Sequence, residues 1–307
     1  MSRIFITIAI IFFSLNVYTQ SADDLNKRGL RSYERGDYDA AIADFTAAIE
    51  KTSRLARNAR GLSNGFAADG DPVDEAALKV RAIDPHTAGY LLNRGNAFLV
   101  RNDIDRAISD YSEALAISPA LVPAYFCRGS AWMIKKDLQH ALADFEKLLK
   151  LDPRYVRGYV GRAMARLDSG DVRGAFEDFD HAIKLEPKNA ANYCQRGDAR
   201  RLTRDLVGAH ADFENAIKLD PRFPNSYLGR GTIRLRDKDF PAAIADFTTA
   251  LTLDPRLAQA YRNRGVVYYI LGKKPEAEKD FSQAVTLAPW LRWEIEANVK
   301  EIEGWRK

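Results

Sequence analysis

The stretch AYFCRGSAWMIKKDLQHALADFEKLLKLDP, residues 124–153, contains two amphipathic segments that are joined by a polar turn. Within each segment apolar residues recur at spacings of three and four, which predicts two helices. The proline that ends the stretch is one of a series with a constant spacing of 34 residues: Pro85, Pro119, Pro153, Pro187, Pro221, Pro255 and Pro289. This spacing indicates a repeated helix–turn–helix unit, and such units pack on their neighbours instead of around one central core.

The residue types of the unit explain how its two helices pack. If each unit is numbered so that proline is position 32, position 8 is almost always glycine, position 20 is alanine and position 24 is aromatic. In the stretch above these residues are Gly129, Ala141 and Phe145. The small residues let the helices approach closely, and the aromatic ring fills the remaining space. Proline then ends the second helix, because it cannot continue the hydrogen-bond ladder.

A charged pair also recurs at fixed positions, with arginine at position 7 and aspartate at position 23. Both positions lie on faces that meet the other helix, where a charge is costly unless it is paired. We therefore expect a bidentate ion pair that ties the two helices of each unit together. The functional alternative is a ladder of arginines that binds an acidic ligand, although the aspartates would neutralise it. The expected pairs are Arg94–Asp110, Arg128–Asp144, Arg162–Asp178, Arg196–Asp212, Arg230–Asp246 and Arg264–Asp280, with Arg28–Asp44 in an earlier unit.

These positions, repeated in register, resemble the tetratricopeptide repeat family over residues 22–289. The resemblance implies an all-α, right-handed superhelical solenoid of about eight helix–turn–helix repeats. The second repeat, residues 54–87, departs from the pattern. Its segment 61–75 is rich in glycine, asparagine and aspartate, which favours a loop and a shortened first helix. Sequence drift and a partner-specific loop or hinge are both open for this degenerate repeat.

The C-terminal end of the chain differs from the repeats. Residues 290–307 carry Leu291, Ile295, Val299 and Ile302 at helical spacing, which predicts a capping helix over the exposed face of the last repeat. Three of the four tryptophans lie in this segment. They either fill the contact between the capping helix and the last repeat or form an exposed aromatic docking patch.

Residues 1–21 show the pattern of a signal peptide, with a basic start, an apolar run over residues 4–17 and a polar end. The apolar run is short for a membrane span, which needs about 20 residues. We therefore expect export to the periplasm or cell envelope, with an uncleaved anchor or a folded first helix as alternatives. Cys127 and Cys194 are separated by a whole repeat, so we expect two free thiols and no disulfide.

The sequence offers no catalytic, cofactor-binding or metal-binding motif. Its four histidines fall at unrelated repeat positions without a cysteine or carboxylate partner at metal-ligand spacing. Phosphate-cradling glycine loops and hydrolase motifs are also absent from the sequence. The net charge of +4 is too small to indicate a nucleic-acid partner. We therefore expect a binding protein and not an enzyme, with no cofactor.

In the tetratricopeptide family the first helices line a concave groove through positions 2, 5, 9 and 12. The resemblance implies that an extended peptide or a partner helix lies along this groove, whose middle is apolar here. The alternative is that many of these side chains pack between neighbouring repeats. Some family members hold an acidic C-terminus in a clamp of lysine, asparagine and arginine, but here Asn96 stands alone and residue 92 is leucine. The expected groove residues are Leu92, Asn96, Leu99, Phe126, Ser130, Met133, Val160, Met164, Leu228, Leu235 and Tyr269.

The sequence therefore predicts an exported, non-catalytic scaffold or adaptor that binds another protein and is itself monomeric. There are two alternatives. One is a membrane-tethered accessory subunit of an envelope complex, if residues 4–17 are retained. The other is a helical-repeat nucleic-acid binder, which the aliphatic groove and the paired arginines disfavour.

Overall fold

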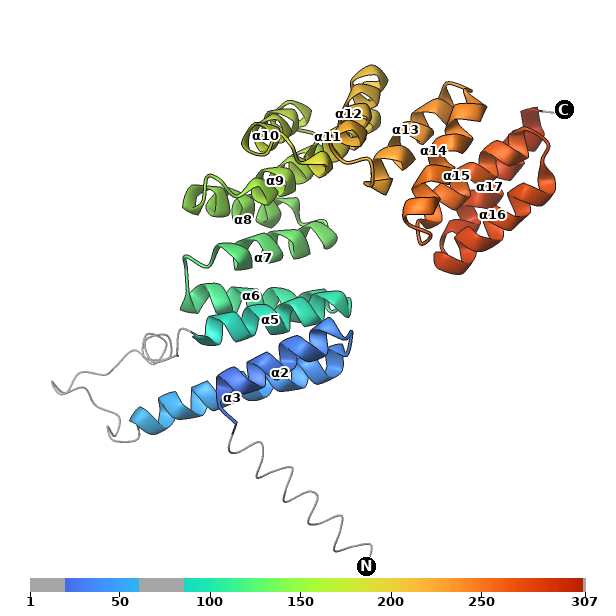
Figure 1. Ribbon diagram of the computed structural model, residues 1–307. Coiled ribbons are helices and arrows are strands. Elements are labelled where there is room, and N and C mark those ends of the chain that lie inside the picture. The colour runs from blue at the N-terminus through green and yellow to red at the C-terminus, as the bar shows by residue number, and fades with distance from the viewer. Residues whose placement is uncertain (1–19, 61–85, 306–307) are drawn as a thin grey trace, which may run out of the picture. The chain divides into compact units, whose positions relative to one another are not determined.

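The computed structural model describes residues 20–60 and 86–305, and in those ranges every regular element is an α-helix (Figure 1). The all-α prediction is therefore confirmed. The chain divides into two compact units, residues 1–165 and 166–307, and the division falls inside α9 (Val156–Ser169). The predicted apolar segment 4–17 and the predicted loop 61–75 lie outside the described residues. Among the helices described, none combines the length and the apolar character that a membrane crossing requires.

The first unit consists of helices that follow one another as first and second members of helix–turn–helix pairs, with short turns inside each pair. Each second helix also packs against the first helix of the next pair, so the pairs form a stack within this unit. Its helices are α2 (Ala22–Glu34), α3 (Tyr38–Arg60), α5 (His86–Val100), α6 (Ile104–Ile117), α7 (Val122–Ile134) and α8 (Leu138–Leu151), followed by the start of α9.

The second unit repeats this arrangement and adds one unpaired helix at its end. Its helices after α9 are α10 (Val172–Leu185), α11 (Ala190–Leu202), α12 (Leu206–Leu219), α13 (Pro224–Arg236), α14 (Phe240–Leu253), α15 (Ala258–Ile270), α16 (Lys274–Leu287) and α17 (Leu291–Trp305).

The turn inside each pair has a local sequence cause. In the α7–α8 turn Lys136 has a φ of 60°, which reverses the chain after the first helix. Asp137 follows and its side chain accepts a hydrogen bond from the backbone N–H of His140 at 3.2 Å, so it caps the second helix. The equivalent aspartates cap four other second helices: Asp103 caps α6, Asp171 caps α10, Asp205 caps α12 and Asp239 caps α14. This polar turn is the reason that the two helices of a unit are separate and antiparallel.

Glycine at position 8 is explained by the aromatic ring opposite it. A Cβ atom added to Gly95 would lie 2.6 Å from the ring of Tyr111, and one added to Gly129 would lie 3.0 Å from the ring of Phe145. Both rings are at most 1% exposed. The ring therefore occupies the volume that a larger residue at position 8 would need, as the sequence pattern predicted.

The arginine and aspartate of the recurring pair lie within hydrogen-bonding distance of each other. Arg128 donates from Nε to Asp144 Oδ2 at 2.8 Å and from Nη2 to Oδ1 at 2.7 Å. Its Nη1 donates to Ser112 Oγ of α6 at 3.0 Å, so one guanidinium holds three helices. The hydrogen bond to Asp144 raises the pKa of Arg128, and burial opposes that shift. The same two-pronged contact joins Arg28 to Asp44, Arg94 to Asp110, Arg196 to Asp212, Arg230 to Asp246 and Arg264 to Asp280.

Sequence reasoning missed a second arginine on some of these aspartates. Arg200 Nη1 lies 2.9 Å from Asp212 Oδ2, and Arg234 Nη1 lies 2.8 Å from Asp246 Oδ2. The predicted pair Arg162–Asp178 has one residue in each of the two compact units. Within the second unit, Asp178 Oδ2 lies 2.8 Å from Nη1 of Arg166. The second arginine occupies position 11, where Arg166, Arg200 and Arg234 recur 34 residues apart, so the periodic pattern carried a signal that sequence reasoning did not use.

Most of the predicted degenerate repeat, residues 54–87, lies outside the described residues, which include only its two ends, 54–60 and 86–87. Residues 54–60 continue α3, so no separate first helix begins there. α5 packs directly on α2 and α3, where Thr87 Oγ1 donates to Thr52 Oγ1 at 2.9 Å and Asn93 Nδ2 donates to Asn26 Oδ1 at 3.0 Å. In the described part of the chain the pair α2–α3 is therefore a direct neighbour of α5.

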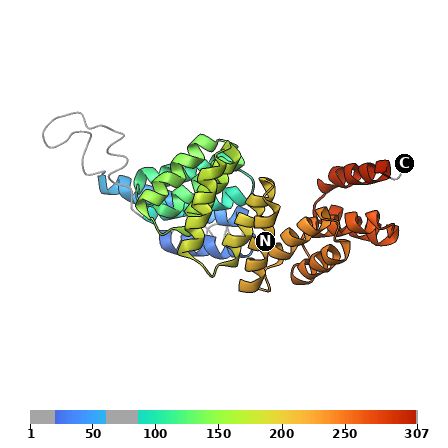
Figure 2. The ribbon, with the colours of Figure 1, turned by 90° about the horizontal axis from the view of Figure 1, so that it is seen from above.

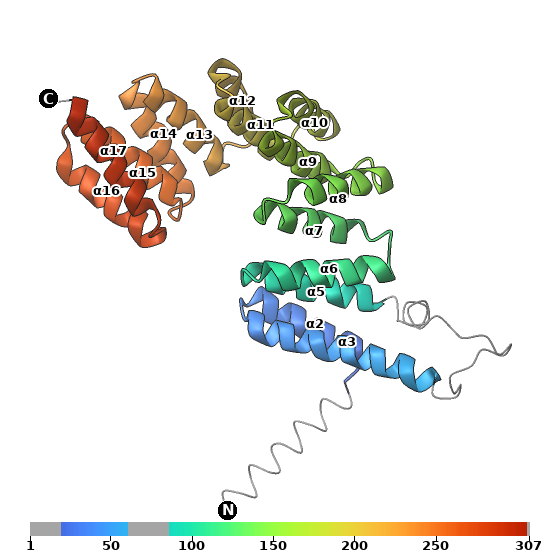
Figure 3. The same ribbon diagram turned by 180° about the vertical axis from the view of Figure 1, so that it is seen from behind.

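α17 lies against α15 and α16 at the end of the second unit (Figures 2 and 3). Leu291, Ile295 and Ile302 are buried in this contact, at 0%, 7% and 4% exposure, so the prediction of a capping helix is confirmed. Two of the tryptophans do not fill the contact. Trp290, in the turn before α17, and Trp293, in its first turn, are 61% and 75% exposed.

We expect Asp144→Asn to destabilise the protein strongly, since it leaves the guanidinium of Arg128 half-buried without its counter-charge. Breaking a buried ion pair from one side costs about 3–5 kcal/mol. The control is Glu146→Gln on the same helix, where the side chain is exposed. Urea unfolding followed by circular dichroism should show a lower midpoint for Asp144→Asn and an unchanged one for the control; equal midpoints would show that the pair contributes nothing.

Candidate functional site: a polar cavity on three first helices

Most of the expected groove residues of the first unit are used in packing. Leu92 and Leu99 pack into the cluster around Tyr111 and Ala131. The ring of Phe126 lies 6.1 Å from that of Phe145 and 5.8 Å from that of Tyr155, as measured between centroids. These side chains fill the space between neighbouring repeats, so the packing alternative holds for them.

The polar groove residues of this unit are also engaged, whereas its last members are more open. Asn96 Oδ1 accepts a hydrogen bond from the Tyr111 hydroxyl at 2.8 Å, and Ser130 Oγ donates to the Phe126 carbonyl at 2.8 Å. Met133 packs on the cluster of Ala141, Phe145 and Ala165. Val160 is half-buried, and Met164 is 40% exposed. Val160 and Met164 are thus partly open to solvent, whereas Asn96, Ser130 and Met133 make contacts within the protein.

In the second unit the outcome is different for each expected groove residue. Tyr269 is not a groove residue: it is only 8% exposed, and its hydroxyl donates to Glu303 Oε1 of α17 at 2.7 Å. The capping helix covers it. Leu228 lines a cavity on the first helices, and Leu235 lines a second cavity nearer to α17. These two cavities are open parts of the surface that the sequence pattern assigned to a partner.

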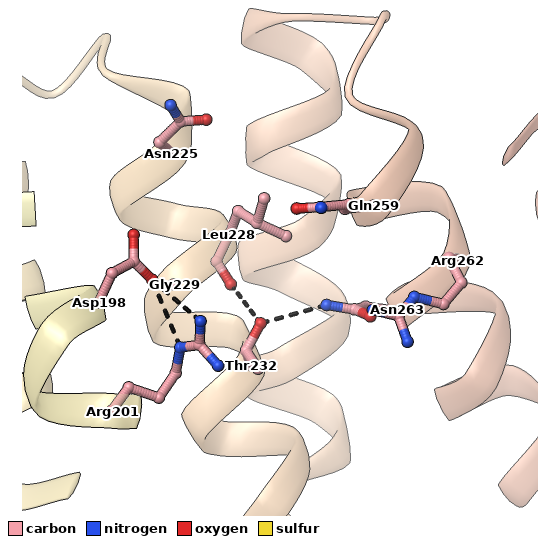
Figure 4. A pocket seen from close by; sticks show the side chains of 9 residues that line it. All are labelled: Asp198, Arg201, Asn225, Leu228, Gly229, Thr232, Gln259, Arg262 and Asn263. Atoms are coloured by element: carbon pink, nitrogen blue, oxygen red, sulfur yellow. Dashed lines mark hydrogen bonds and ion pairs between the residues drawn. The ribbon is translucent and has the colours of Figure 1, made fainter. Parts of the chain in front are cut away.

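The first of them, called here the polar cavity, has a volume of about 300 Å³ and lies on α11, α13 and α15 (Figure 4). On α13 its lining residues are spaced by three and four, so they share one helical face. The residues follow positions 2, 5, 6, 9 and 12 of three successive units. The lining consists of Asp198, Arg201, Asn225, Leu228, Gly229, Thr232, Gln259, Arg262 and Asn263.

Part of the lining is internally hydrogen-bonded. Asn263 Nδ2 donates to Thr232 Oγ1 at 3.2 Å, and Thr232 Oγ1 donates to the Leu228 carbonyl at 2.7 Å. Arg201 Nη2 lies 3.2 Å from Asp198 Oδ1. Burial raises the pKa of Asp198, and the positive charge of Arg201 partly opposes that shift. These contacts fix the orientation of the middle and one wall of the cavity.

Other polar groups of the lining are unused. Asn225 and Gln259 are exposed, and within the described part of the chain their side chains make no hydrogen bond. The Nε of Arg262 is buried and has no acceptor there, while its Nη1 lies 3.3 Å from Glu294 and 3.5 Å from Asn298 of α17. A buried donor without a partner costs about 1–3 kcal/mol, so an acceptor placed in the cavity would recover that energy.

The floor of the polar cavity is bare backbone because of packing beneath it. A Cβ atom on Gly229 would lie 2.3 Å from the ring of Phe213, which is fully buried. Sequence reasoning missed this cavity because it singled out the apolar members of positions 5, 9 and 12. The signal was present in the polar members of the same positions, Asp198, Arg201 and Arg262.

The lining offers amide and guanidinium groups for hydrogen bonding and carries no metal-binding cluster. Across residues 20–60 and 86–305, no group of three or more histidine, cysteine or acidic side chains could hold a metal ion. The chemistry that this arrangement supports is recognition of polar atoms, such as peptide carbonyl and amide groups.

The two cysteines are free thiols, and neither lines the polar cavity. Cys127 is partly buried and Cys194 lies in the cluster around Phe213. Burial raises the pKa of Cys127 to about 11 and that of Cys194 to about 12. Neither is a reactive nucleophile at neutral pH, because the thiolate is the reactive form.

Sequence profiles of the tetratricopeptide repeat match residues 62–121, 122–155 and 258–290, and a profile described as TPR repeat matches residues 233–272. None of the curated protein sequences matches the chain.

Solved structures share the fold. A tetratricopeptide repeat protein from Parabacteroides merdae has 19% identity and a TM-score of 0.68, with 92% of this chain and 99% of that chain covered. Yeast Tom70 has 18% identity and a TM-score of 0.60, with coverage of 94% and 65%. Pseudomonas aeruginosa pilF has 15% identity and a TM-score of 0.57, with coverage of 71% and 96%. At these identities the likeness concerns the fold.

We expect both thiols to react slowly with a disulfide reagent in the folded protein at pH 8. With a pKa of about 11 for Cys127, roughly one thiol in a thousand is ionised at that pH. The labelling rate should rise about tenfold per pH unit up to pH 10, and unfolding in urea should remove the protection. Rapid labelling of native protein at pH 7 would contradict the burial of these side chains.

Proposed function

The chain is a tetratricopeptide repeat protein, and from this premise we propose that it is a non-catalytic scaffold that binds a partner protein through the polar cavity. The observation that carries the proposal is the set of unused hydrogen-bonding groups on α13 and α15, namely Asn225, Gln259 and the Nε of Arg262. The Nε of Arg262 has lost contact with bulk water without gaining a partner in the protein, whereas the side-chain amides of Asn225 and Gln259 are exposed to solvent. A partner that supplies acceptors and donors to them binds favourably.

The chemistry of these groups favours an extended peptide over a helix. Side-chain amides donate and accept at once, so they match the alternating N–H and C=O groups of an extended backbone. A helix has already bonded its own backbone groups to each other and could offer only side chains. The proposed ligand is therefore an extended segment of another protein that crosses α11, α13 and α15.

The composition of the lining supports binding in preference to catalysis. It holds no histidine, cysteine or serine, and its one hydroxyl, on Thr232, already donates to a backbone carbonyl. The arginines of the recurring pairs also weigh against nucleic acid as the partner. Their guanidinium groups form ion pairs with buried aspartates, so they do not form a basic surface that could bind phosphates.

We further propose that the protein acts outside the cytoplasm, in the periplasm or cell envelope. This rests on the apolar run of residues 4–17 after a basic start. A monomer that is exported and then binds an extended segment of a partner would serve as an adaptor or assembly factor. The same run would make the protein a membrane-tethered accessory subunit if it stays attached.

We expect the double variant Asn225→Ala and Gln259→Ala to bind peptides about tenfold more weakly than the unaltered protein. Each lost hydrogen bond is worth about 0.5–1.5 kcal/mol. The probes are peptides selected on the full chain from a displayed random-sequence library, and affinity is measured by fluorescence anisotropy. Gln283→Ala, at an exposed position of α16, is the control and should bind normally. If the double variant binds as well as the control, the polar cavity is not the binding site.

Mass spectrometry of the protein purified from a bacterial expression host tests export. We expect the mature chain to begin near residues 19–22, where small residues follow the apolar run. A full-length chain in the membrane fraction would instead support the tethered form. A full-length chain in the cytoplasm would rule out both the exported form and the tethered form.

A further inference from the structure

A second cavity, called here the apolar cavity, lies next to the polar one and has a volume of about 550 Å³. Its walls come from the end of α13, the start of α14, α15 and the capping helix α17. Leu235, Phe240, Val266, Ile270 and Ile302 form its apolar lining. The capping helix thus contributes a wall to an open site as well as covering the last repeat.

The apolar cavity exists because α17 covers only part of α15. Ile302 and Tyr269 are buried in the contact between the two helices, at 4% and 8% exposure. Val266 and Ile270, on the neighbouring face of α15, are only half-buried. Apolar surface left in contact with water favours burial by about 25 cal/mol per Å², so this gap is a place where an apolar side chain of a ligand would be held.

The two cavities are neighbours along the same helices. Arg262 lines the polar cavity, and its Nη1 lies 3.5 Å from Oδ1 of Asn298, which lines the apolar cavity. On α13, Leu228 and Leu235 line one cavity each, and they lie two helical turns apart, about 10 Å along the axis. An extended peptide covers that distance with about three residues. One short segment can therefore occupy both cavities.

The rim of the apolar cavity is positively charged. Arg236 and Lys238 line it, both are exposed, and neither has a hydrogen bond or ion pair within the described residues. The lining contains a single acidic residue, Glu301. The nearby Asp239 does not line the cavity, and its carboxylate caps α14 by accepting from Ala242. Asp237, between the two cations in the sequence, is exposed and does not line the cavity either, so Arg236 and Lys238 outnumber Glu301 in the lining and complement an acidic side chain.

We infer that the partner segment carries a large apolar residue next to an acidic one, with the apolar side chain in the apolar cavity and the acidic one beside Arg236 and Lys238. This inference rests on the proposed function, because it places the same segment's backbone in the polar cavity about three residues away. It makes α17 a part of the specificity of the site.

The test uses peptides selected from the displayed random-sequence library on the full chain. The inference predicts that selected peptides share an aromatic or large aliphatic residue adjacent to aspartate or glutamate. Glu301→Trp, which places an indole at the cavity wall, should weaken binding of these peptides by at least tenfold. The matched control is Lys300→Trp, one residue away on the exposed face of α17, which should bind as the unaltered protein does.

A charge exchange separates recognition from damage to the fold. Arg236→Glu should weaken binding of the selected peptides about tenfold, and replacing the acidic residue of the peptide by lysine should restore much of the loss. A variant that merely unfolds cannot be rescued by a change in the peptide. Thermal midpoints equal to that of the Lys300→Trp control confirm that each variant is folded.

The outcomes distinguish this inference from the proposed function. If selected peptides lack the shared pair and bind Glu301→Trp and Arg236→Glu normally, yet lose affinity for the Asn225→Ala and Gln259→Ala double variant, the inference is wrong and the proposed function stands. If the double variant and the α17 variant both bind normally, or no peptide is selected, both are wrong.

Discussion

The structure depends on one buried ion pair that is repeated along the chain. Within a unit, the Nε and Nη2 edge of the arginine holds both oxygens of the aspartate, as Arg128 does with Asp144 at 2.8 and 2.7 Å. The remaining Nη1 reaches the second helix of the preceding unit, as in the contacts of Arg128 with Ser112 and of Arg264 with Thr248. One arginine side chain therefore joins the two helices of its own repeat and connects that repeat to the preceding one. This is the type of contact that an array without a central core requires.

This use of charge determines what is left for binding. Because the arginines at position 7 are spent on aspartates, the surface of the first helices is decided by positions 2, 5, 9 and 12. In the first unit position 5 is filled by Leu92 and Phe126, whose bulk closes the space between repeats. In the second unit position 5 is occupied by Leu228 and Arg262, which line the polar cavity. The same repeat position is thus packed at Leu92 and Phe126 and open at Leu228 and Arg262.

The sequence was sufficient to predict what depends on the repeat. The period located the helices, glycine at position 8 identified the aromatic ring opposite it, and the pairing of Arg128 with Asp144 followed from the cost of burying either alone. Whether a groove residue is open could not be predicted, because that depends on side chains from other segments. Phe126 is closed in by Tyr155 at the start of the next unit, and Tyr269 by Glu303 of α17. Segment 54–87 keeps the repeat pattern only at Arg60-Gly61 and Asp84-Pro85, so the continuation of α3 to Arg60 could not be predicted from the repeat.

The capping helix shows how one element can serve both stability and recognition. A cap must bury the apolar face of the last repeat, and the stripe from Leu291 to Ile302 does so along one side of α17. The cap need not cover that face completely, however, because apolar surface outside the contact simply stays exposed to solvent. Where α17 falls short, Val266 and Ile270 stay half-buried, and Asn298 and Glu301 stand at the edge of the gap. The residues of a cap that face such a gap are released from the requirements of packing, so their identity can be set by what the gap has to hold.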